Sequence, residues 1–321
     1  MPAPDLPNPY PMEIEAPDIT AYRRGNTGID YITRFDSGRP GAHVMITALV
    51  HGNEICGAIA LDWLFRQGVR PVAGCLSLGF MNVAAYRLFD PARPGFSRFV
   101  EEDFNRIWSA ETLDGPRRSL ELDRARAVRP HIDSVDLLLD LHSMQTPNPA
   151  LTLAGPLPKG RALARALGMP AHIVCDVGHA SGTRLRDYGA FADPSGPRNA
   201  LLVECRQHWE AEAAPTAIET AIRFLVVTGV VAGDFGAEFL AARPKPAPQC
   251  CIEVTEAVTI RSAAFRFLEN YRGMEVIARA GTAIAMDGDR PVTTPYDDCV
   301  LIMPSHRLLP GATAVRLGRF V

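Results

Sequence analysis

Two histidines and a glutamate have the residue types and the surroundings of metal ligands. His51 and Glu54 are three residues apart, where an apolar run ends and a helical pattern begins, and Gly52 gives the turn between them conformational freedom. His142 directly follows another apolar run, residues 135–141. Two imidazoles and a carboxylate, with a fourth position left for water, form the ligand set of a catalytic zinc site. These residues are candidate ligands for one Zn²⁺ per chain.

A carboxylate, Glu204, interrupts the apolar run 200–205. An unpaired buried carboxylate is costly, so it needs a cation, a hydrogen-bond network or a raised pKa. Glu204 is therefore either paired with an arginine such as Arg206 or Arg198, or it acts as general base and acid beside a metal-bound water. In a separate segment, Asn105 and Arg106 place an amide next to a guanidinium, a combination that can hold a substrate carboxylate.

Short apolar runs alternating with helical patterns must position these residues. We expect strands at 43–50, 74–81, 135–141, 171–176 and 200–205, and helices at 55–66, 119–128, 160–167 and 213–230. Strands that are apolar almost throughout indicate a mostly parallel or mixed sheet with helices on both faces. Ligands of such open sheets bind at the carboxyl ends of the strands, where the candidate residues lie.

The pattern changes at the proline-rich connector Arg243-Pro-Lys-Pro-Ala-Pro248. After it come short strand-like runs separated by turn signals, which is typical of a small antiparallel β unit. We therefore expect a catalytic domain at residues 1–242 and a small all-β domain at residues 243–321.

The composition favours a protein that acts on small molecules. With 321 residues, 47% of them hydrophobic, and a formal net charge of −3, the chain can form a large core and has no basic excess for nucleic acid or a membrane surface. The first ten residues lack the basic start and apolar run of a signal peptide. Seven scattered cysteines argue against a disulfide framework, so we expect a reduced, cytoplasmic protein.

Four short motifs follow one another along the chain: His51-Gly-Asn-Glu54, Asp103-Phe-Asn-Arg106, Asp140-Leu-His142 and Val203-Glu204. In this order they resemble the succinylglutamate desuccinylase and aspartoacylase family of zinc-dependent deacylases, which is itself similar to the zinc carboxypeptidases. The resemblance covers about residues 40–230, and the all-β tail is similar to the smaller carboxyl-terminal domain of that family.

The resemblance implies a role for each matched residue. His51, Glu54 and His142 would bind zinc, and Glu204 would activate the metal-bound water and then protonate the leaving amine. Asn105 and Arg106 would bind the carboxylate of the amino-acid part of a small N-acyl amino acid. Asp140 is a candidate to orient one of the imidazoles.

The chain departs from the family pattern at Asn82-Val-Ala-Ala85, which lacks the arginine expected to polarise the scissile carbonyl. Arg87 is our candidate for that role because it is closest in sequence, with Arg93 and Arg98 as alternatives. Zinc alone is a further possibility.

Two more substrate contacts are expected from loops. Arg184 lies in the glycine-rich segment 182–189, ahead of the Glu204 strand, and Tyr296 lies in the β domain next to two acids. Two other functions remain open at this stage: a metallocarboxypeptidase that acts on peptides, and a zinc-binding module without catalysis. A homo-oligomer is also open, and the sequence singles out neither the acyl group nor the amine.

Overall fold

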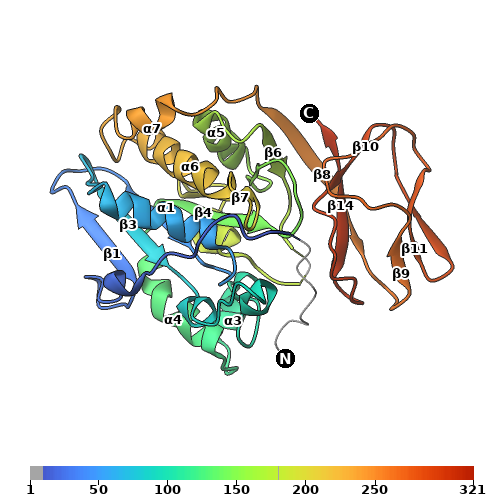
Figure 1. Cartoon of the computed structure of the whole chain (residues 1–321), viewed down its shortest axis with the longest axis horizontal. Coiled ribbons are helices and arrows are strands. Elements are labelled where there is room, and N and C mark those ends of the chain that lie inside the picture. Colours follow the sequence, from blue (N-terminus) through green and yellow to red (C-terminus); the bar gives the residue numbers. More distant parts are fainter. Residues whose placement is uncertain (1–9, 180) are drawn as a thin grey trace.

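The computed structural model describes residues 10–179 and 181–321. The first nine residues, in which the sequence predicts no signal peptide, lie outside this part. An eleven-stranded mixed sheet runs through the molecule in the order β1-β3-β2-β4-β7-β5-β6-β8-β14-β13-β10 (Figure 1). Its first seven strands are β1 (Ile32–Asp36), β2 (His43–Ala48), β3 (Cys75–Phe80), β4 (Leu137–Met144), β5 (Leu151–Leu153), β6 (His172–Cys175) and β7 (Asn199–Gln207).

Helices cover both faces of this part of the sheet. On one face lie α1 (Ile55–Arg66), α5 (Pro158–Leu167), α6 (Ala213–Val227) and α7 (Ala237–Ala241), and on the other lie α3 (Ala110–Asp114) and α4 (Leu120–Ile132). Two separate apolar cores fill the spaces between the sheet and these two layers. The central strands β2, β4 and β7 pair in parallel and are buried on both sides, which explains their nearly continuous apolar sequences.

The carboxyl-terminal strands continue the same sheet. β8 (Cys250–Thr259) pairs in parallel with β6 and antiparallel with β14 (Thr313–Phe320), followed by β13 (Cys299–Ile302) and β10 (Val276–Ile277). A separate antiparallel sheet contains β9 (Phe265–Phe267), β11 (Ala283–Asp287) and β12 (Arg290–Thr293). This β unit has its own apolar core, and a further cluster joins it to β4, β5 and β7.

The fold class predicted from the sequence is confirmed: a mostly parallel mixed sheet with helices on both faces, and a small antiparallel sheet near the carboxyl terminus. The pattern missed β1 and the three-residue strand β5, because their runs are too short or too polar to stand out. It also missed the short helix α2 (Val83–Tyr86) and the 3₁₀ turns at Thr20–Tyr22, Pro94–Ser97, Phe104–Arg106, Leu185–Asp187 and Gly189–Phe191.

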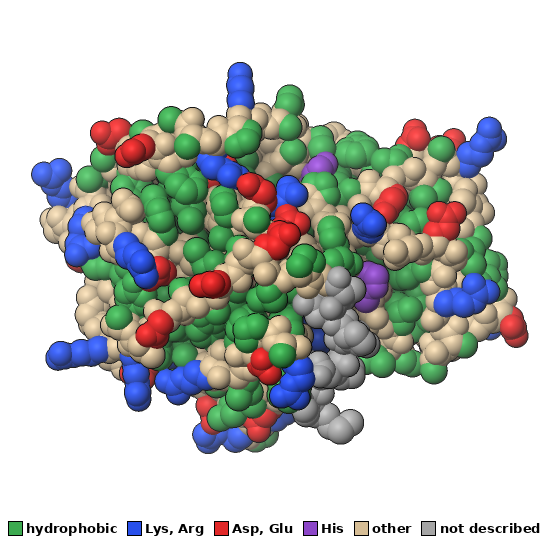
Figure 2. Space-filling view, viewed as in Figure 1, with side chains coloured by type: hydrophobic (Ala, Val, Ile, Leu, Met, Phe, Trp, Pro, Cys, Tyr) green, Lys and Arg blue, Asp and Glu red, His purple; other side chains and the backbone are tan. Residues whose placement is uncertain are grey.

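Charges are well mixed on the face of the molecule shown in Figure 2, where acidic and basic side chains alternate with apolar ones. Within the described ranges, no helix combines the length and the apolar character needed to cross a membrane.

Candidate active site

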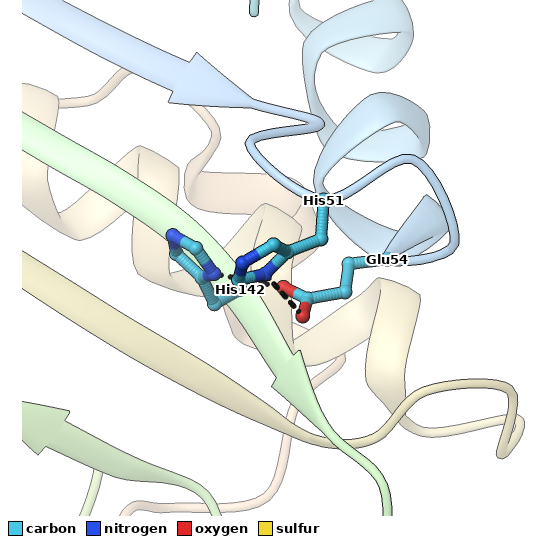
Figure 3. A group of neighbouring side chains, drawn as sticks. All are labelled: His51, Glu54 and His142. Atoms are coloured by element: carbon cyan, nitrogen blue, oxygen red, sulfur yellow. Dashed lines mark hydrogen bonds and ion pairs between the residues drawn. The ribbon is translucent and has the colours of Figure 1, made fainter. Parts of the chain in front are cut away.

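His51, Glu54 and His142 lie together below the surface (Figure 3). Glu54 is at the amino-terminal end of α1 and lies between the two imidazoles. Its Oε1 is 2.7 Å from His51 Nδ1, and its Oε2 is 2.8 Å from His142 Nδ1. The ligand atoms of the three residues are all within 4.8 Å of one another. The turn after β2 and the strand β4 thus bring one carboxylate and two imidazoles to one point.

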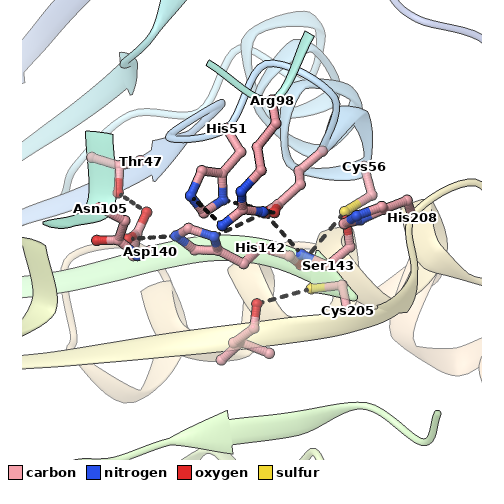
Figure 4. A network of polar contacts seen from close by, with 12 residues as sticks. Thr47, His51, Cys56, Arg98, Asn105, Asp140, His142, Ser143, Cys205 and His208 are labelled. Carbon is pink, nitrogen blue, oxygen red and sulfur yellow. Dashed lines mark hydrogen bonds and ion pairs between the residues drawn. The ribbon is translucent and has the colours of Figure 1, made fainter. Parts of the chain in front are cut away.

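Other carboxylates lie on the far side of each imidazole, as Figure 4 shows for Asp140 and His142. Asp140 Oδ2 is 2.8 Å from His142 Nε2, and Asp140 Oδ1 accepts a hydrogen bond of 2.7 Å from the Thr47 hydroxyl. Asp103 Oδ1 is 2.9 Å from His51 Nε2. Asp140 and His142 are two residues apart in one strand and therefore face the same side. Each imidazole thus directs its Nδ1 toward Glu54, the arrangement that a histidine ligand needs.

The chemistry of these donors fits a zinc ion. Burial lowers the pKa of His142, but Asp140 and Glu54 outweigh burial and raise this pKa well above its usual value. Burial likewise opposes ionisation of Glu54, while the two histidines hold its pKa well below the usual range. Positive charge at this point therefore stabilises the ionised carboxylates. Two imidazoles and one carboxylate match the protein ligands of catalytic zinc sites.

Glu204 is directly beside the histidine that comes from β4. β4 and β7 pair in parallel with His142 opposite Glu204, so both side chains project from the same face of the sheet. Glu204 is 6% exposed, and its buried Oε2 has no hydrogen-bond partner among the residues that the structure describes. Burial and the nearby charge of Glu54 raise the pKa of Glu204 to about 8. The ion pair with Arg206 that the sequence left open does not form, because Arg206 pairs with Glu210.

Arg98 approaches the same group from the loop that follows the 3₁₀ turn at 94–97. Its guanidinium is 3.3 Å from Glu54 Oε1 and 3.1 Å from Asp103 Oδ2. Asp103 and Glu54 raise the pKa of Arg98 against the opposing effect of burial. Arg98 therefore stays charged next to the candidate ligands.

A cavity of about 350 Å³ opens onto these residues. Asn105 and Arg106 line it together with His51, Glu54 and Glu204. Asn105 Oδ1 accepts a 2.8 Å hydrogen bond from the backbone N–H of Leu185, and an Arg106 N–H donates to the Asn105 carbonyl at 2.7 Å. The β unit supplies part of the wall through Met303, Pro304, Ser305, Arg307, Ala312, Thr313 and Arg316.

Of the other predicted site residues, Arg184 lies at the cavity, whereas Arg87 and Tyr296 lie elsewhere. Arg184 lines the cavity, but its guanidinium makes two hydrogen bonds to Asp176, of 2.8 and 2.9 Å. Arg87 is exposed at the end of α2, and its guanidinium contacts the Tyr31 hydroxyl at 3.3 Å, outside the cavity lining. The hydroxyl group of Tyr296 is 2.6 Å from Thr255 Oγ1, within the β unit and also outside the lining.

The sequence did not single out some of the residues that line the cavity, and it offered Arg98 only as an alternative. Arg98 was an alternative to Arg87, although it is only five residues before Asp103 and thus belongs to the same motif segment. His208 is four residues after Glu204, and no partner pattern in the sequence marks it. Arg307 and Arg316 lie in the β unit, and no local pattern in the sequence distinguishes them from surface arginines.

Comparison with known proteins identifies the catalytic part. Residues 40–195 match the model of the succinylglutamate desuccinylase/aspartoacylase catalytic domain. A probable aspartoacylase from Parasynechococcus marenigrum is 32% identical over 142 residues, which cover 40% of this chain and 45% of that protein. The alignment thus spans less than half of that relative. Within residues 40–195, the chain therefore contains the catalytic domain of the succinylglutamate desuccinylase/aspartoacylase family.

Solved structures share the fold over nearly the whole chain. Succinylglutamate desuccinylase from Vibrio cholerae superposes with a TM-score of 0.66 at 16% identity, covering 91% of this chain and 86% of that one. A succinylglutamate desuccinylase/aspartoacylase from Rhodobacter sphaeroides gives 0.63 at 18% identity, with 90% and 88% covered. The product-bound ectoine utilization protein EutE from Ruegeria pomeroyi gives 0.60 at 15% identity, with 92% of both chains covered.

Proposed function

We propose that this protein is a zinc-dependent deacylase that hydrolyses the amide bond of a small N-acyl amino acid. One observation carries the proposal: Glu204, with an unpartnered buried oxygen, is opposite His142 on neighbouring strands and next to the candidate metal ligands. A metal site with an adjacent carboxylate that is free to exchange a proton is the arrangement that metal-assisted hydrolysis requires.

His51, Glu54 and His142 would hold one Zn²⁺, which when bound supplies a Lewis acid and a water whose pKa is lowered to about 7. Glu204 takes a proton from the attacking water at its unpartnered oxygen. It then delivers this proton to the nitrogen of the leaving amine, so that a carboxylate and an amine are released. Asp140 and Asp103 keep the two imidazoles oriented throughout.

The arginines would orient the substrate. Arg98 is charged and next to the candidate ligands, so it is suited to donate hydrogen bonds to the carbonyl oxygen as negative charge develops there. In our proposal Arg98 takes the role for which the sequence suggested Arg87. Asn105 and Arg106 would hold the carboxylate of the amino-acid part, as the family resemblance implies.

The size of the cavity supports a small substrate. A volume of about 350 Å³ is at the lower end of the range for small-molecule sites. The β unit forms part of the wall, which restricts the extended groove that a peptide chain would need. These features favour a deacylase over a metallocarboxypeptidase.

The test is a panel of N-acetyl, N-formyl and N-succinyl amino acids, assayed for released amine with wild-type protein and with Glu204→Gln. We expect wild-type protein to hydrolyse at least one member, and Glu204→Gln to bind zinc equally well while losing at least about a thousandfold in kcat. Metal content is measured for both, with His51→Ala as the variant that should lose zinc.

Two results would contradict the proposal. Activity of Glu204→Gln within a few-fold of wild type would exclude Glu204 as the proton carrier. A zinc content below about half an equivalent, unchanged in His51→Ala, would instead favour the binding module that the sequence left open.

A further inference from the structure

A buried carboxylate outside the cavity lining holds the loop at residues 98–103. It belongs to Glu121, in the first turn of α4, whose side chain is fully buried. Its Oε1 accepts hydrogen bonds from the Val100 backbone N–H at 2.7 Å and from the Asn82 amide at 3.1 Å. Its Oε2 accepts them from the backbone N–H groups of residues 101 and 102, at 3.1 and 3.4 Å. Four N–H donors thus converge on one carboxylate, and three of them belong to the loop.

Side chains of the loop bind α4 in return. Glu101 Oε2 accepts a hydrogen bond from the backbone N–H of Leu120, the first residue of α4, and Glu102 Oε1 accepts one from the Ser119 hydroxyl. The first N–H groups of a helix have no partner within the helix, and the contact from Glu101 satisfies one of them. Hydrogen bonds in both directions therefore join the loop to the helix.

The same loop is also fixed to the turn that carries two of the candidate ligands. The Gly52 backbone N–H donates a hydrogen bond of 3.1 Å to the Arg98 carbonyl. A Cβ atom at residue 52 would lie 2.4 Å from the Ser97 carbonyl oxygen, so the close approach of the two segments requires glycine. The loop therefore connects α4 to the turn at residues 51–54.

Both ends of the held segment contact the candidate metal ligands. At one end the Arg98 guanidinium is 3.3 Å from Glu54 Oε1, and at the other Asp103 Oδ1 is 2.9 Å from His51 Nε2. Arg98 and Asp103 also pair with each other at 3.1 Å. The three N–H groups that Glu121 binds lie between these two residues in the sequence. A shift of the segment would therefore move both side chains relative to the candidate ligands.

We infer that Glu121 is a positioning residue of the active site. It acts through Arg98 and Asp103, because it binds the backbone between them and does not line the cavity. Burying a carboxylate costs free energy, which charge-assisted hydrogen bonds from N–H groups offset. A neutral side chain of the same size would avoid that cost but could not accept all four hydrogen bonds. This inference rests on the proposed function, in which Arg98 donates to the carbonyl oxygen.

The experiment is a double-mutant cycle of Glu121→Gln with Arg98→Gln at saturating zinc. In Glu121→Gln an NH₂ group replaces one acceptor oxygen and faces two N–H donors, so the loop should shift. We expect kcat/KM on the best N-acyl amino acid of the panel to fall about 10- to 100-fold, since a misplacement of about 1 Å can cost that much. In the Arg98→Gln background the same change should cost less than about threefold, because the positioned donor is already absent.

Glu219→Gln is the matched control. Glu219 is also a buried glutamate on a helix, where it pairs with Arg223 and Arg243 outside the cavity lining. Glu219→Gln should lower the temperature of thermal unfolding and leave kcat/KM within about threefold of wild type.

An equal loss from Glu121→Gln in both backgrounds would overturn the inference, and so would a kcat/KM within about threefold of wild type in the single variant. If Glu121→Gln does not fold, Glu121→Asp takes its place in the cycle. Aspartate keeps the charge but is one CH₂ shorter, so it should give a smaller loss that likewise disappears in the Arg98→Gln background.

Failure to hydrolyse any N-acyl amino acid would overturn the proposed function, and zinc affinity then tests the positioning role without a substrate. By chelator competition, Glu121→Gln should weaken zinc binding about tenfold, because the loop orients His51 through Asp103. In the Asp103→Asn background the same change should weaken it by less than about twofold. Unchanged affinity in Glu121→Gln, or equal weakening in both backgrounds, would overturn the positioning role.

Discussion

At the scale of single residues, Arg98 is the arginine that forms an ion pair with Glu54, the carboxylate between the two candidate histidine ligands. We predict that Arg98→Gln lowers kcat/KM by about 10²–10³, because one donor to a developing oxyanion is worth about that much. Arg87→Gln should stay within about threefold of wild type, since Arg87 is exposed and outside the cavity lining. Steady-state kinetics of both variants decides between the two arginines, and the reverse order of effects would restore Arg87.

Asp140 is a positioning residue, because it touches His142 and Thr47 but does not itself line the cavity. Asp140→Asn should weaken zinc binding by about 10- to 100-fold, as expected when the partner of a ligating imidazole loses its charge. Chelator competition measures this affinity, and the exposed Asp289→Asn is the control. Unchanged affinity in Asp140→Asn would mean that His142 needs no such support.

The sequence allowed prediction of those site residues that carry a local signal. His51, Glu54 and His142 adjoin or interrupt apolar runs, and Glu204 is a charge inside one. Arg307 has no such signal, since its place depends on how the β unit packs against the cavity. The choice between Arg87 and Arg98 likewise depends on the path of an irregular loop, which residue spacing does not determine.

At the scale of elements, Asp176 and Arg184 join the end of β6 to the loop before β7 through a buried, doubly hydrogen-bonded ion pair. Burial raises the pKa of Asp176, but Arg184 outweighs burial and lowers this pKa below 3.8 in the folded protein. The pair therefore stabilises the fold fully above about pH 4, and this stabilisation is lost as the pH falls through the lowered pKa.

Asp176→Asn should consequently reduce the free energy of unfolding at pH 7 by about 3 kcal/mol, because one partner of a buried pair is removed. The reduction should shrink at pH 3, where wild-type protein has begun to lose the same contribution. Urea unfolding at the two pH values gives both numbers, with Asp289→Asn as control. An equal loss at both pH values would show that the charge of Asp176 does not matter.

Element boundaries could be predicted where pattern and packing agree. The helix expected at 55–66 is observed as Ile55–Arg66, because its apolar face packs against the sheet along its whole length. The strand expected at 135–141 continues to Met144 and carries His142 within it. Polar ligand residues interrupt the apolar pattern, so the pattern ends before the strand does.

At the scale of the whole molecule, the sheet does not stop at the connector near residue 243. β8 pairs with β6 and β14, and an apolar cluster of Met144, Leu153 and Ile302, among others, crosses the junction. We predict that a chain truncated after residue 242 does not fold stably, because β6 becomes an exposed edge and this cluster loses one side. Soluble yield and thermal unfolding test this, and a cooperative transition within about 5 °C of the full chain would contradict it.

The pairing of β4 with β7 ties the assembly of the site to the assembly of the sheet. His142 and Glu204 occupy one rung of the ladder, so a slip of a single residue would turn one of them to the opposite face. If β4 and β7 pair out of register during folding, the site therefore lacks one of these two residues. Recovery of hydrolytic activity after refolding would therefore report the register of β4 against β7, because the proposed activity needs His142 and Glu204 on the same face of the sheet.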